Sequence, residues 1–250
     1  MLRVIVHGYL GQMGQVISDL IATDENFKLV AGIDKSAENQ NLPNVYGNIE
    51  NCRDTADVII DFSNPSAIDG LLKYAVDHST ALVIGTTGYE KGEMKKLEKA
   101  GEEIPIFYSA NMSLGINLLL NLVSKTASVL GEDFDIEIIE KHHNKKIDAP
   151  SGTAYMIANK INEEFQNEKV YNFGRYTKDQ RRNPNEIGIH AIRGGTIVGE
   201  HSVIFAGLDE ILEIKHSASS KNVFGKGALE AAKFISKQNN GLYSMKDLMI

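Results

Sequence analysis

The sequence predicts an α/β fold in two parts: a parallel sheet covered by helices on both faces, and a second domain built on a mixed sheet. Short apolar segments rich in β-branched residues alternate with helical patterns over residues 1–111, which predicts the parallel sheet. Three strand patterns then follow one another between residues 187 and 216 with no helix between them. Consecutive strands predict an antiparallel portion, so the second domain should be α+β.

The first strand, Leu2–Val6, leads through a glycine-rich turn into the first helix. The turn contains Gly8, Gly11 and Gly14, and the helix shows apolar spacing through Met13, Val16, Ile17, Leu20 and Ile21. Glycines in such a turn allow close approach of a pyrophosphate to backbone N–H groups and close packing of helix on strand. The strand, turn and helix together therefore predict a dinucleotide site, although the spacing differs from the commoner Gly-x-Gly-x-x-Gly.

The second strand, Lys28–Ile33, ends at an acidic residue, Asp34. A carboxylate about 20 residues beyond the last glycine accepts hydrogen bonds from the ribose hydroxyls of a dinucleotide. Lys35 follows directly and is able to reach a 2′-phosphate. This pair leaves both NAD and NADP open.

Three further strands, Val58–Asp61, Ala81–Ile84 and Ile104–Tyr108, alternate with helices at Pro65–His78 and Glu90–Gly101. Ligands bind beyond the carboxyl ends of parallel strands. Small or polar segments stand there and are candidates to line the nicotinamide half of a cofactor: Asp61-Phe62-Ser63, Gly85-Thr86-Thr87-Gly88 and Ser109-Ala110-Asn111-Met112.

The second domain is expected to begin with a long apolar helix, Leu114–Leu130, and to end before a last helix, Asn222–Lys237, that returns to the first domain. The expected domains are thus 1–111 with 222–250 for the dinucleotide, and 112–221 for substrate and oligomerisation. The polar stretch Gln166–Asn185 is expected to be a surface or intersubunit loop. The strands expected in the second domain after this stretch are Ile187–Arg193, Thr196–Ala206 and Glu210–His216, with Gly194-Gly195 as the turn between the first two.

The segment Glu140–Ala154 holds the densest group of side chains that can bind an anion or transfer a proton. It has two histidines and three lysines just before a helix start. Neighbouring residues of a strand point to opposite faces, so His142 and His143 should have different functions. Ser151 is a good N-cap, and the N–H groups of Gly152 and Thr153 would then face the lysines. A helix N-terminus beside lysines is an anion site, which predicts a bound carboxylate or phosphate.

A metal site is not predicted, because adjacent strand histidines diverge and the single cysteine, Cys52, is distant in sequence. With one cysteine no internal disulfide can form, which fits the cytoplasm. The 250 residues carry a formal net charge of −7, which argues against a nucleic-acid surface. No apolar run was found to approach the roughly 20 residues of a membrane span, so no membrane partner is expected.

These motifs resemble the 4-hydroxy-tetrahydrodipicolinate reductase family, also called dihydrodipicolinate reductase, of the diaminopimelate route to lysine. The resemblance spans essentially the whole chain. The matching segments are Glu140–Ala154, the glycine turn, Gly85–Gly88, Asn111, Arg193-Gly194-Gly195, Gly199-Glu200-His201 and His216–Ser220. Two positions depart from the family: Gln12 replaces a commonly basic residue, and Met112 replaces an aromatic one.

The resemblance implies a Rossmann-type domain, a mixed-sheet substrate domain, a homotetramer built through those sheets, a dicarboxylate substrate, and NADH or NADPH as cofactor. It implies that His142 is the general acid, Lys146 a second proton donor, His143 a substrate ligand, and Gly152 with Thr153 the carboxylate clamp. The implied cofactor residues are Gly8, Tyr9, Leu10, Gly11, Gln12, Met13, Asp34, Lys35, Gly85, Thr86, Thr87, Ser109, Ala110, Asn111 and Met112.

Two other functions remain open from the sequence. Another nicotinamide-dependent dehydrogenase of the same architecture would share the first domain but would not need two histidines before a Pro-Ser-Gly-Thr helix start. A dinucleotide sensor without catalysis is the second, because a fold does not determine function.

Overall fold

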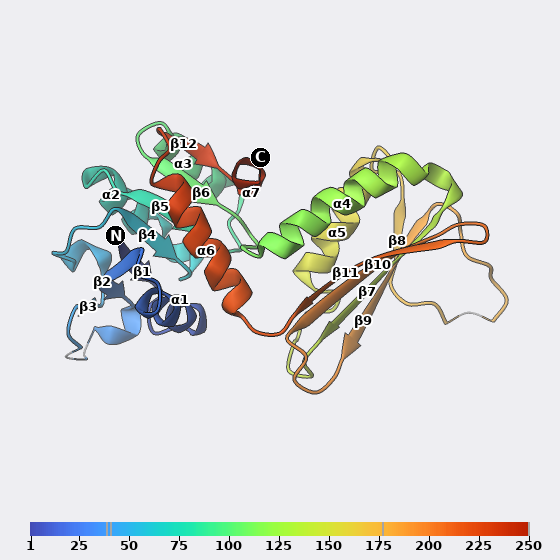
Figure 1. Ribbon diagram of the computed structural model, residues 1–250, viewed down its shortest axis with the longest axis horizontal. Helices are drawn as coiled ribbons and strands as arrows, with labels where there is room; N and C mark the ends of the chain where they lie inside the picture. Colours follow the sequence, from blue (N-terminus) through green and yellow to red (C-terminus); the bar gives the residue numbers. More distant parts are fainter. Residues whose placement is uncertain (39, 41, 177, 250) are drawn as a thin grey trace. The chain divides into compact units, whose positions relative to one another are not determined.

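The computed structural model describes residues 1–38, 40, 42–176 and 178–249, which form two compact units (Figure 1). Unit 1 comprises Met1–Leu114 and Lys221–Ile250, and unit 2 comprises Gly115–Ser220. Each unit has its own sheet. The predicted α/β fold, with a parallel sheet and a separate mixed sheet, is confirmed.

Unit 1 holds a seven-stranded sheet of order β12-β6-β5-β4-β1-β2-β3, in which all neighbouring strands are parallel. Its strands are β1 (Leu2–His7), β2 (Phe27–Ile33), β3 (Val45–Tyr46), β4 (Val58–Asp61), β5 (Ala81–Ile84), β6 (Pro105–Tyr108) and β12 (Gly241–Tyr243). Its α-helices are α1 (Gln12–Ala22), α2 (Ile68–Asp77), α3 (Lys91–Gly101), α6 (Asn222–Ile235) and α7 (Met245–Leu248). The order of strands reverses between β1 and β4, the place where open sheets of this kind bind ligands.

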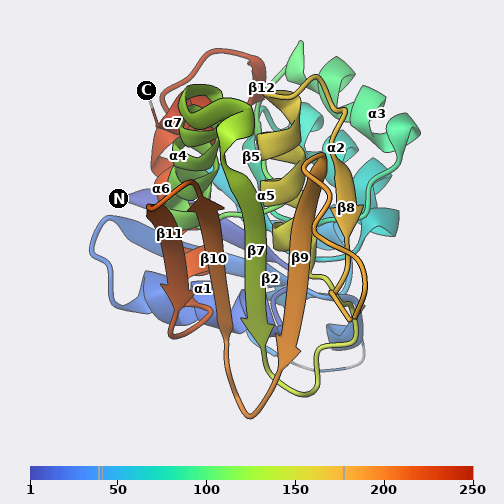
Figure 2. The ribbon, with the colours of Figure 1, turned by 90° about the vertical axis from the view of Figure 1, so that its right-hand side faces the viewer.

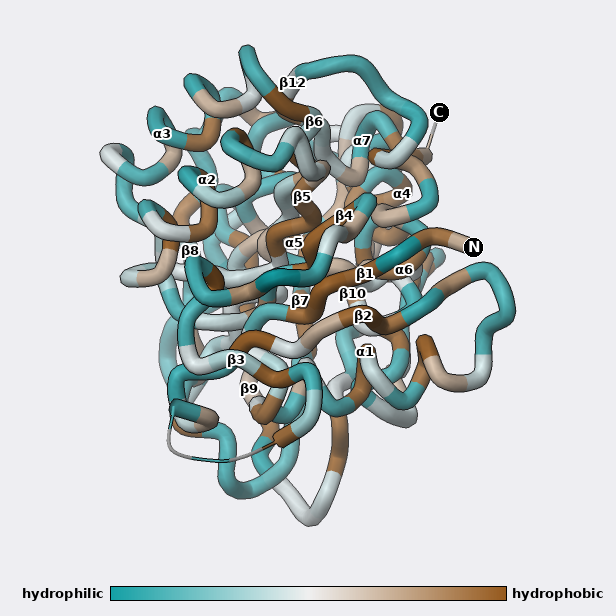
Figure 3. Tube along the Cα trace, turned by 90° about the vertical axis from the view of Figure 1, so that its left-hand side faces the viewer, coloured by the Kyte–Doolittle hydropathy of each residue, from teal (hydrophilic) through white to brown (hydrophobic). Residues whose placement is uncertain are grey.

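Two apolar cores lie on the two faces of this sheet. One joins β1, β4 and β5 to α1 and α6, and includes Ile17 and Ala228. The other joins the opposite faces of the same strands to α2 and α3, and includes Leu71 and Leu97. Because both faces are covered, the strands are continuously apolar, and the segments around β1 and β5 are brown in Figure 3.

Helix α6 packs closely on the chain that follows β6. A Cβ atom added at Gly227 would lie 1.7 Å from the carbonyl oxygen of Met112, so only glycine fits there. The helix buries Ala228, Ala231, Ala232 and Ile235, the face that the apolar spacing predicts.

Unit 2 holds a five-stranded mixed sheet of order β11-β10-β7-β9-β8, with α4 and α5 on one face (Figure 2). Its strands are β7 (Asp135–His142), β8 (Val170–Asn172), β9 (Glu186–Arg193), β10 (Gly199–Ala206) and β11 (Ile211–Ala218). Its helices are α4 (Leu114–Leu130) and α5 (Gly152–Glu163). Residues from both helices and from the sheet form one core, among them Val123, Ile157 and Phe205.

The structure confirms one expectation for the sheet of unit 2 and corrects another. Gly194-Gly195 lies in the turn between β9 and β10, although these strands are not paired, because β7 lies between them, parallel to the first and antiparallel to the second. The turn lies against the segment after β7, where the Asn144 N–H donates to the Gly195 carbonyl at 3.2 Å. The stretch Gln166–Asn185 is not all loop, since it contains the edge strand β8, which pairs with β9.

Helix α4 also corrects an expectation. Together with the short turn that follows it, this helix spans Leu114–Asp133, 20 residues with an 18-residue window of mean hydropathy 1.3, so by length and composition it is apolar enough to cross a membrane. Its residues Leu119, Val123 and Ala127 are buried in the core of unit 2. Only 22% of the apolar window is buried, and Leu118, Leu122 and Val129 are exposed, so the core of unit 2 covers one face of the helix and leaves apolar side chains on the other.

Candidate functional site

The three glycines of the first turn have different structural roles. Gly8 has φ +82°, and a Cβ atom there would lie 2.4 Å from the Phe62 carbonyl oxygen, so this position requires glycine. A Cβ at Gly14 would lie 2.2 Å from the Gly8 carbonyl oxygen, which lets α1 pack on the turn. The nearest atom to a Cβ at Gly11 is 3.1 Å away, and Gly11 is exposed at the start of α1. Backbone N–H groups at this helix start are thus accessible to a phosphate.

Asp34 lies at the end of β2 with its carboxylate held by three hydrogen bonds. Oδ2 accepts from the Leu10 N–H at 2.9 Å, and Oδ1 accepts from the N–H and hydroxyl of Ser36 at 3.0 and 2.6 Å. Burial works against ionisation, but these bonds from Ser36 and Leu10 hold the pKa of Asp34 below its usual value. The group is therefore an anion at neutral pH.

A cavity of about 300 Å³ opens beside this carboxylate, at the ends of β1, β2 and β4. Its walls contain His7, Gly8, Gly11, Asp34, Lys35, Phe62, Ser63, Asn64, Ser66 and Ala67. A glycine-rich turn and a helix start next to an ionised acid at the strand-order reversal suit the adenosine half of a nicotinamide cofactor. The residues present thus fit such a cofactor.

A buried polar network lies at the end of β4. The fully buried Asp61 accepts a hydrogen bond from Thr86 Oγ1 at 2.6 Å, and His7 Nδ1 is 2.8 Å from the same carboxylate. Thr86 in turn accepts from the N–H of Ser63 at 2.8 Å. These contacts connect the ends of β1, β4 and β5, and a Cβ at Gly85 would collide with the Phe62 ring.

The structure places the other predicted cofactor residues as follows. Tyr9, Leu10, Gln12 and Met13 belong to the glycine turn and the start of α1, Thr87 is exposed after β5, and Ser109, Ala110 and Asn111 follow β6. The Ser109 hydroxyl donates to the Asn111 carbonyl at 2.8 Å. Met112 differs, because it is only 2% exposed and its side chain belongs to the core of unit 1.

In unit 2, the predicted acid His142 ends β7 on the face that α5 covers. Its Nδ1 lies 2.6 Å from Oε2 of Glu140, two residues earlier on the same face. Glu140 is completely buried, and Arg193 of β9 donates to both its oxygens at 2.7 Å. Burial opposes the charge on Glu140, but the bonds from Arg193, His142 and Ser151 leave its pKa below the usual value.

Because Glu140 occupies Nδ1, Nε2 is the nitrogen through which His142 can meet a substrate. Gly199 of β10 leaves room at this edge of the ring, since a Cβ there would lie 3.2 Å from Nε2. The ring of His142 also meets that of His201 edge to face, with centroids 5.3 Å apart.

The start of α5 is built as the sequence predicts. The Ser151 hydroxyl accepts a hydrogen bond from the Ala154 N–H at 3.2 Å, and it lies 3.1 Å from Nε2 of His201. Gly152 is exposed, and nothing lies within 4 Å of the position of a Cβ there. An anion can therefore approach the first turn of the helix directly, and Thr153 is half-buried beside it.

The segment between β7 and α5 carries the remaining predicted residues. Lys146 is held at 2.8 Å from Asp148 Oδ1, and its N–H donates to the His143 carbonyl at 3.1 Å. His143 is half-buried, and its Nδ1 has no hydrogen-bond partner among the residues that the structure describes. A polar atom left in this way is a candidate ligand for a substrate.

Three residues of this site had no assigned role in the sequence analysis: Glu140, Arg193 and His201. They come from β7, β9 and β10, and the sheet register brings His142 opposite Arg193 and Glu140 opposite His201. All three lie within matched family motifs, but their contacts depend on β7 being the central strand.

Within residues 1–38, 40, 42–176 and 178–249 no group of three or more His, Cys, Asp or Glu side chains is placed to hold a metal ion.

Comparisons with known proteins cover the whole chain. Residues 2–112 match the model for the N-terminus of dihydrodipicolinate reductase, and residues 115–249 match the model for its C-terminus. A 4-hydroxy-tetrahydrodipicolinate reductase of Caldanaerobacter subterraneus subsp. tengcongensis is 55% identical, covering 100% of this chain and 98% of the relative. One from Clostridium novyi is 48% identical, with the same coverage.

Solved structures give the same result. A dipicolinate-bound dihydrodipicolinate reductase from Paenisporosarcina sp. TG-14 superposes with a TM-score of 0.75 at 25% identity, covering 98% of this chain and 97% of that one. A meso-DAP dehydrogenase mutant from Clostridium tetani has a TM-score of 0.57 at 11% identity, covering 99% and 94%. The second likeness concerns the fold alone.

The buried state of His201 predicts a pH dependence of stability. Burial, together with the neighbouring charge of His142, lowers the pKa of His201 to about 4. An unfolded histidine titrates near 6.5, so below that pH the unfolded chain takes up a proton that the folded chain refuses. Stability from this group is complete above pH 6.5 and falls as the pH drops towards 4.

We therefore expect His201→Gln, whose amide can still accept a bond from Ser151, to reduce the loss of unfolding free energy between pH 7 and pH 5 by about 2 kcal/mol. Urea denaturation of both proteins at the two pH values measures it. Equal losses in the two proteins would contradict the expectation.

Proposed function

The chain belongs to the dihydrodipicolinate reductase family, and from this premise we propose how its residues reduce the substrate. The enzyme is an NAD(P)H-dependent oxidoreductase that converts 4-hydroxy-tetrahydrodipicolinate to tetrahydrodipicolinate with loss of water, in the diaminopimelate route to lysine. Full-length identity of 55% to a reductase of that name supports this assignment. The observation in the structure that carries it is a histidine held through Nδ1 beside an accessible helix start.

The substrate carries two carboxylates, and unit 2 offers groups that suit them. The first turn of α5, where Gly152 is exposed and Thr153 half-buried, takes one carboxylate, with His143 as a further ligand. Lys146, 2.8 Å from Asp148 Oδ1, adds positive charge to the same segment. Together these groups orient a small cyclic dicarboxylate in front of His142.

Loss of the 4-hydroxyl as water leaves a conjugated imine, and its reduction needs one hydride and one proton. The nicotinamide cofactor supplies the hydride when it is bound. His142 supplies the proton from Nε2, and Lys146 is the second donor. An imidazole suits proton transfer near neutral pH, which matches this role.

Replacing the acid tests this assignment. We expect His142→Gln to lower kcat by about a hundred- to ten-thousand-fold while cofactor binding is unchanged, because the acid is lost but the cofactor residues lie in unit 1. Absorbance loss at 340 nm, with substrate generated by the preceding synthase, measures kcat. An unchanged kcat would remove His142 from the chemistry, and no oxidation by the wild-type protein would contradict the function itself.

For the cofactor we propose that NADH is preferred to NADPH. The ionised Asp34 at the cavity would accept bonds from the adenosine ribose hydroxyls and would repel a 2′-phosphate. Lys35 lines the same cavity and partly offsets the repulsion, so NADPH is used as well.

We expect Asp34→Asn to raise the ratio of kcat/KM for NADPH to that for NADH by about tenfold, because it removes the negative charge and keeps the shape. Steady-state kinetics with each cofactor give the ratio. Asp57→Asn, which removes a carboxylate bound to Arg3 outside that cavity, serves as control and should leave the ratio unchanged. The same ratio in all three proteins would contradict the proposal.

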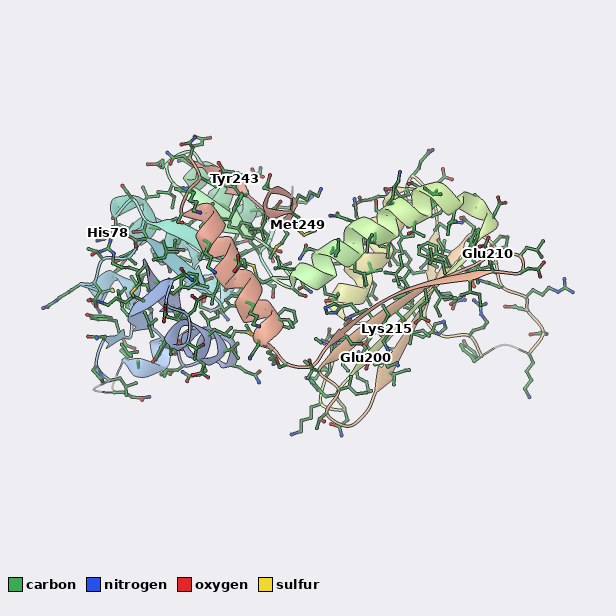
Figure 4. All side chains as sticks on the ribbon, in the orientation of Figure 1. His78, Glu200, Glu210, Lys215, Tyr243 and Met249 are labelled. Carbon is green, nitrogen blue, oxygen red and sulfur yellow. The ribbon has the colours of Figure 1, made fainter. Side chains whose placement is uncertain are left out.

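The open face of the sheet in unit 2 supports a homotetramer as the assembly. Ile192 and Ile211 are 45% and 73% exposed on this face, beside ion pairs such as Lys215–Glu200 at 3.0 Å (Figure 4). Helices cover only the opposite face of the sheet, and self-association would cover this one. Sedimentation equilibrium should give four times the 27.5 kDa chain mass, and a monomer would contradict the proposal.

A cytoplasmic location, supported by one buried cysteine, is tested by cell fractionation.

A further inference from the structure

Glu140 uses both carboxylate oxygens to connect two parts of the candidate site. Oε2 receives His142 Nδ1 at 2.6 Å, and Oε1 receives the Ser151 N–H, at the start of α5, at 3.0 Å. Arg193 bridges the two oxygens through Nη1 and Nη2, each at 2.7 Å. One fully buried carboxylate thus holds the proposed proton donor and the proposed carboxylate clamp.

This arrangement sets the protonation pattern of the imidazole. An ionised carboxylate can only accept, so Nδ1 of His142 must carry a proton when it bonds to Glu140. A second proton on Nε2 then gives an imidazolium whose charge lies beside an anion. Without that anion, Nδ1 is free to lose its proton, and the ring becomes a neutral tautomer that is a weaker acid.

Stability alone does not require these charges. A buried ion pair is often no more stable than well-packed apolar residues of the same volume, because removing charges from water is costly. The fixed geometry is the feature that apolar residues cannot supply, since the Arg193 fork holds the carboxylate in one plane.

We propose that Glu140 is the positioning residue of this enzyme: it fixes the tautomer and orientation of His142 relative to the start of α5, and Arg193 keeps it in place. The proposal rests on the proposed function, in which His142 gives the proton. Glu140 itself does not contact the substrate.

Glu140→Gln tests it, because the Gln carbonyl can still accept from Ser151 while its amide meets His142 with a donor instead of an anion. We expect kcat to fall about a hundredfold, as for loss of a general acid, with KM and the Kd of dipicolinate changed by less than about threefold. The ¹⁵N shifts of the His142 ring should change from the Nδ1-protonated to the Nε2-protonated neutral form.

Glu137→Gln is the matched control. Glu137 lies on the same strand but on the opposite face, and it also pairs with a histidine and with arginines: His190 at 2.8 Å, Arg182 at 3.0 Å and Arg175 at 3.5 Å. We expect its kcat to stay within about twofold of wild type, because none of these partners belongs to the proposed site. An equal loss of kcat in the two variants would overturn the proposal, since it would show a general effect of weakening β7.

Arg193→Lys provides a second variant if Glu140→Gln does not fold. Lysine keeps the charge but cannot bridge two oxygens, so kcat should fall by about tenfold with KM little changed. A kcat within twofold of wild type in a folded Glu140→Gln, or an unchanged His142 tautomer, would overturn the proposal. Wild-type protein that oxidises no cofactor with substrate would instead count against the proposed function, so the two failures are distinct.

Discussion

A carboxylate that is removed from water must meet a hydrogen-bond donor at each oxygen, and in unit 2 this requirement connects three segments. Glu140 on β7 is surrounded by Arg193 from β9, Ser151 from the start of α5, and His142 from its own strand. The pairing of β7 with β9 brings this arginine alongside the carboxylate. The proposed acid, the proposed anion site and the pairing of β7 with β9 thus meet at one buried charge.

Unit 1 depends on a different constraint, the close approach of backbone to backbone. Glycine at positions 8 and 14 lets the first turn press on the end of β4 and on α1, and Gly227 does the same for α6. Side chains at these positions would push the layers apart and fill the space that a pyrophosphate needs. The proposed cofactor site therefore depends on glycine positions that leave space for the ligand, and Asp34 is its main charged group.

The two units consequently recognise their ligands differently. The proposed dinucleotide site offers a helix start and one ionised acid, which is typical of the strand-order reversal in open parallel sheets. The proposed substrate site also uses a helix start, but it adds histidine and lysine side chains whose positions depend on paired charges. Chemistry that moves a proton needs groups held in one orientation, and buried ion pairs supply that orientation.

Much of this protein was predictable because its signals are local. Alternation of apolar strands with amphipathic helices, the glycine turn before α1 and the Ser151 cap each depend on residues within a few positions of one another, and they gave the fold class and the helix starts correctly. The roles of the remaining site residues, Lys146 among them, were inferred from the family resemblance. Local signals failed for the short edge strand β8, which exists only because β9 lies beside it.

The sequence by itself determined the fold class, the family and the residue types of both sites, since these follow from periodicity, turns and motif spacing. Only the tertiary structure decided that β7 lies between β9 and β10, that the Met112 side chain lies in the core of unit 1, and that Glu140 bonds to His142. The physical reason is that sheet register brings together residues about 50 positions apart, such as His142 and Arg193. Such pairing is chosen by the packing of a whole core, which no single segment encodes.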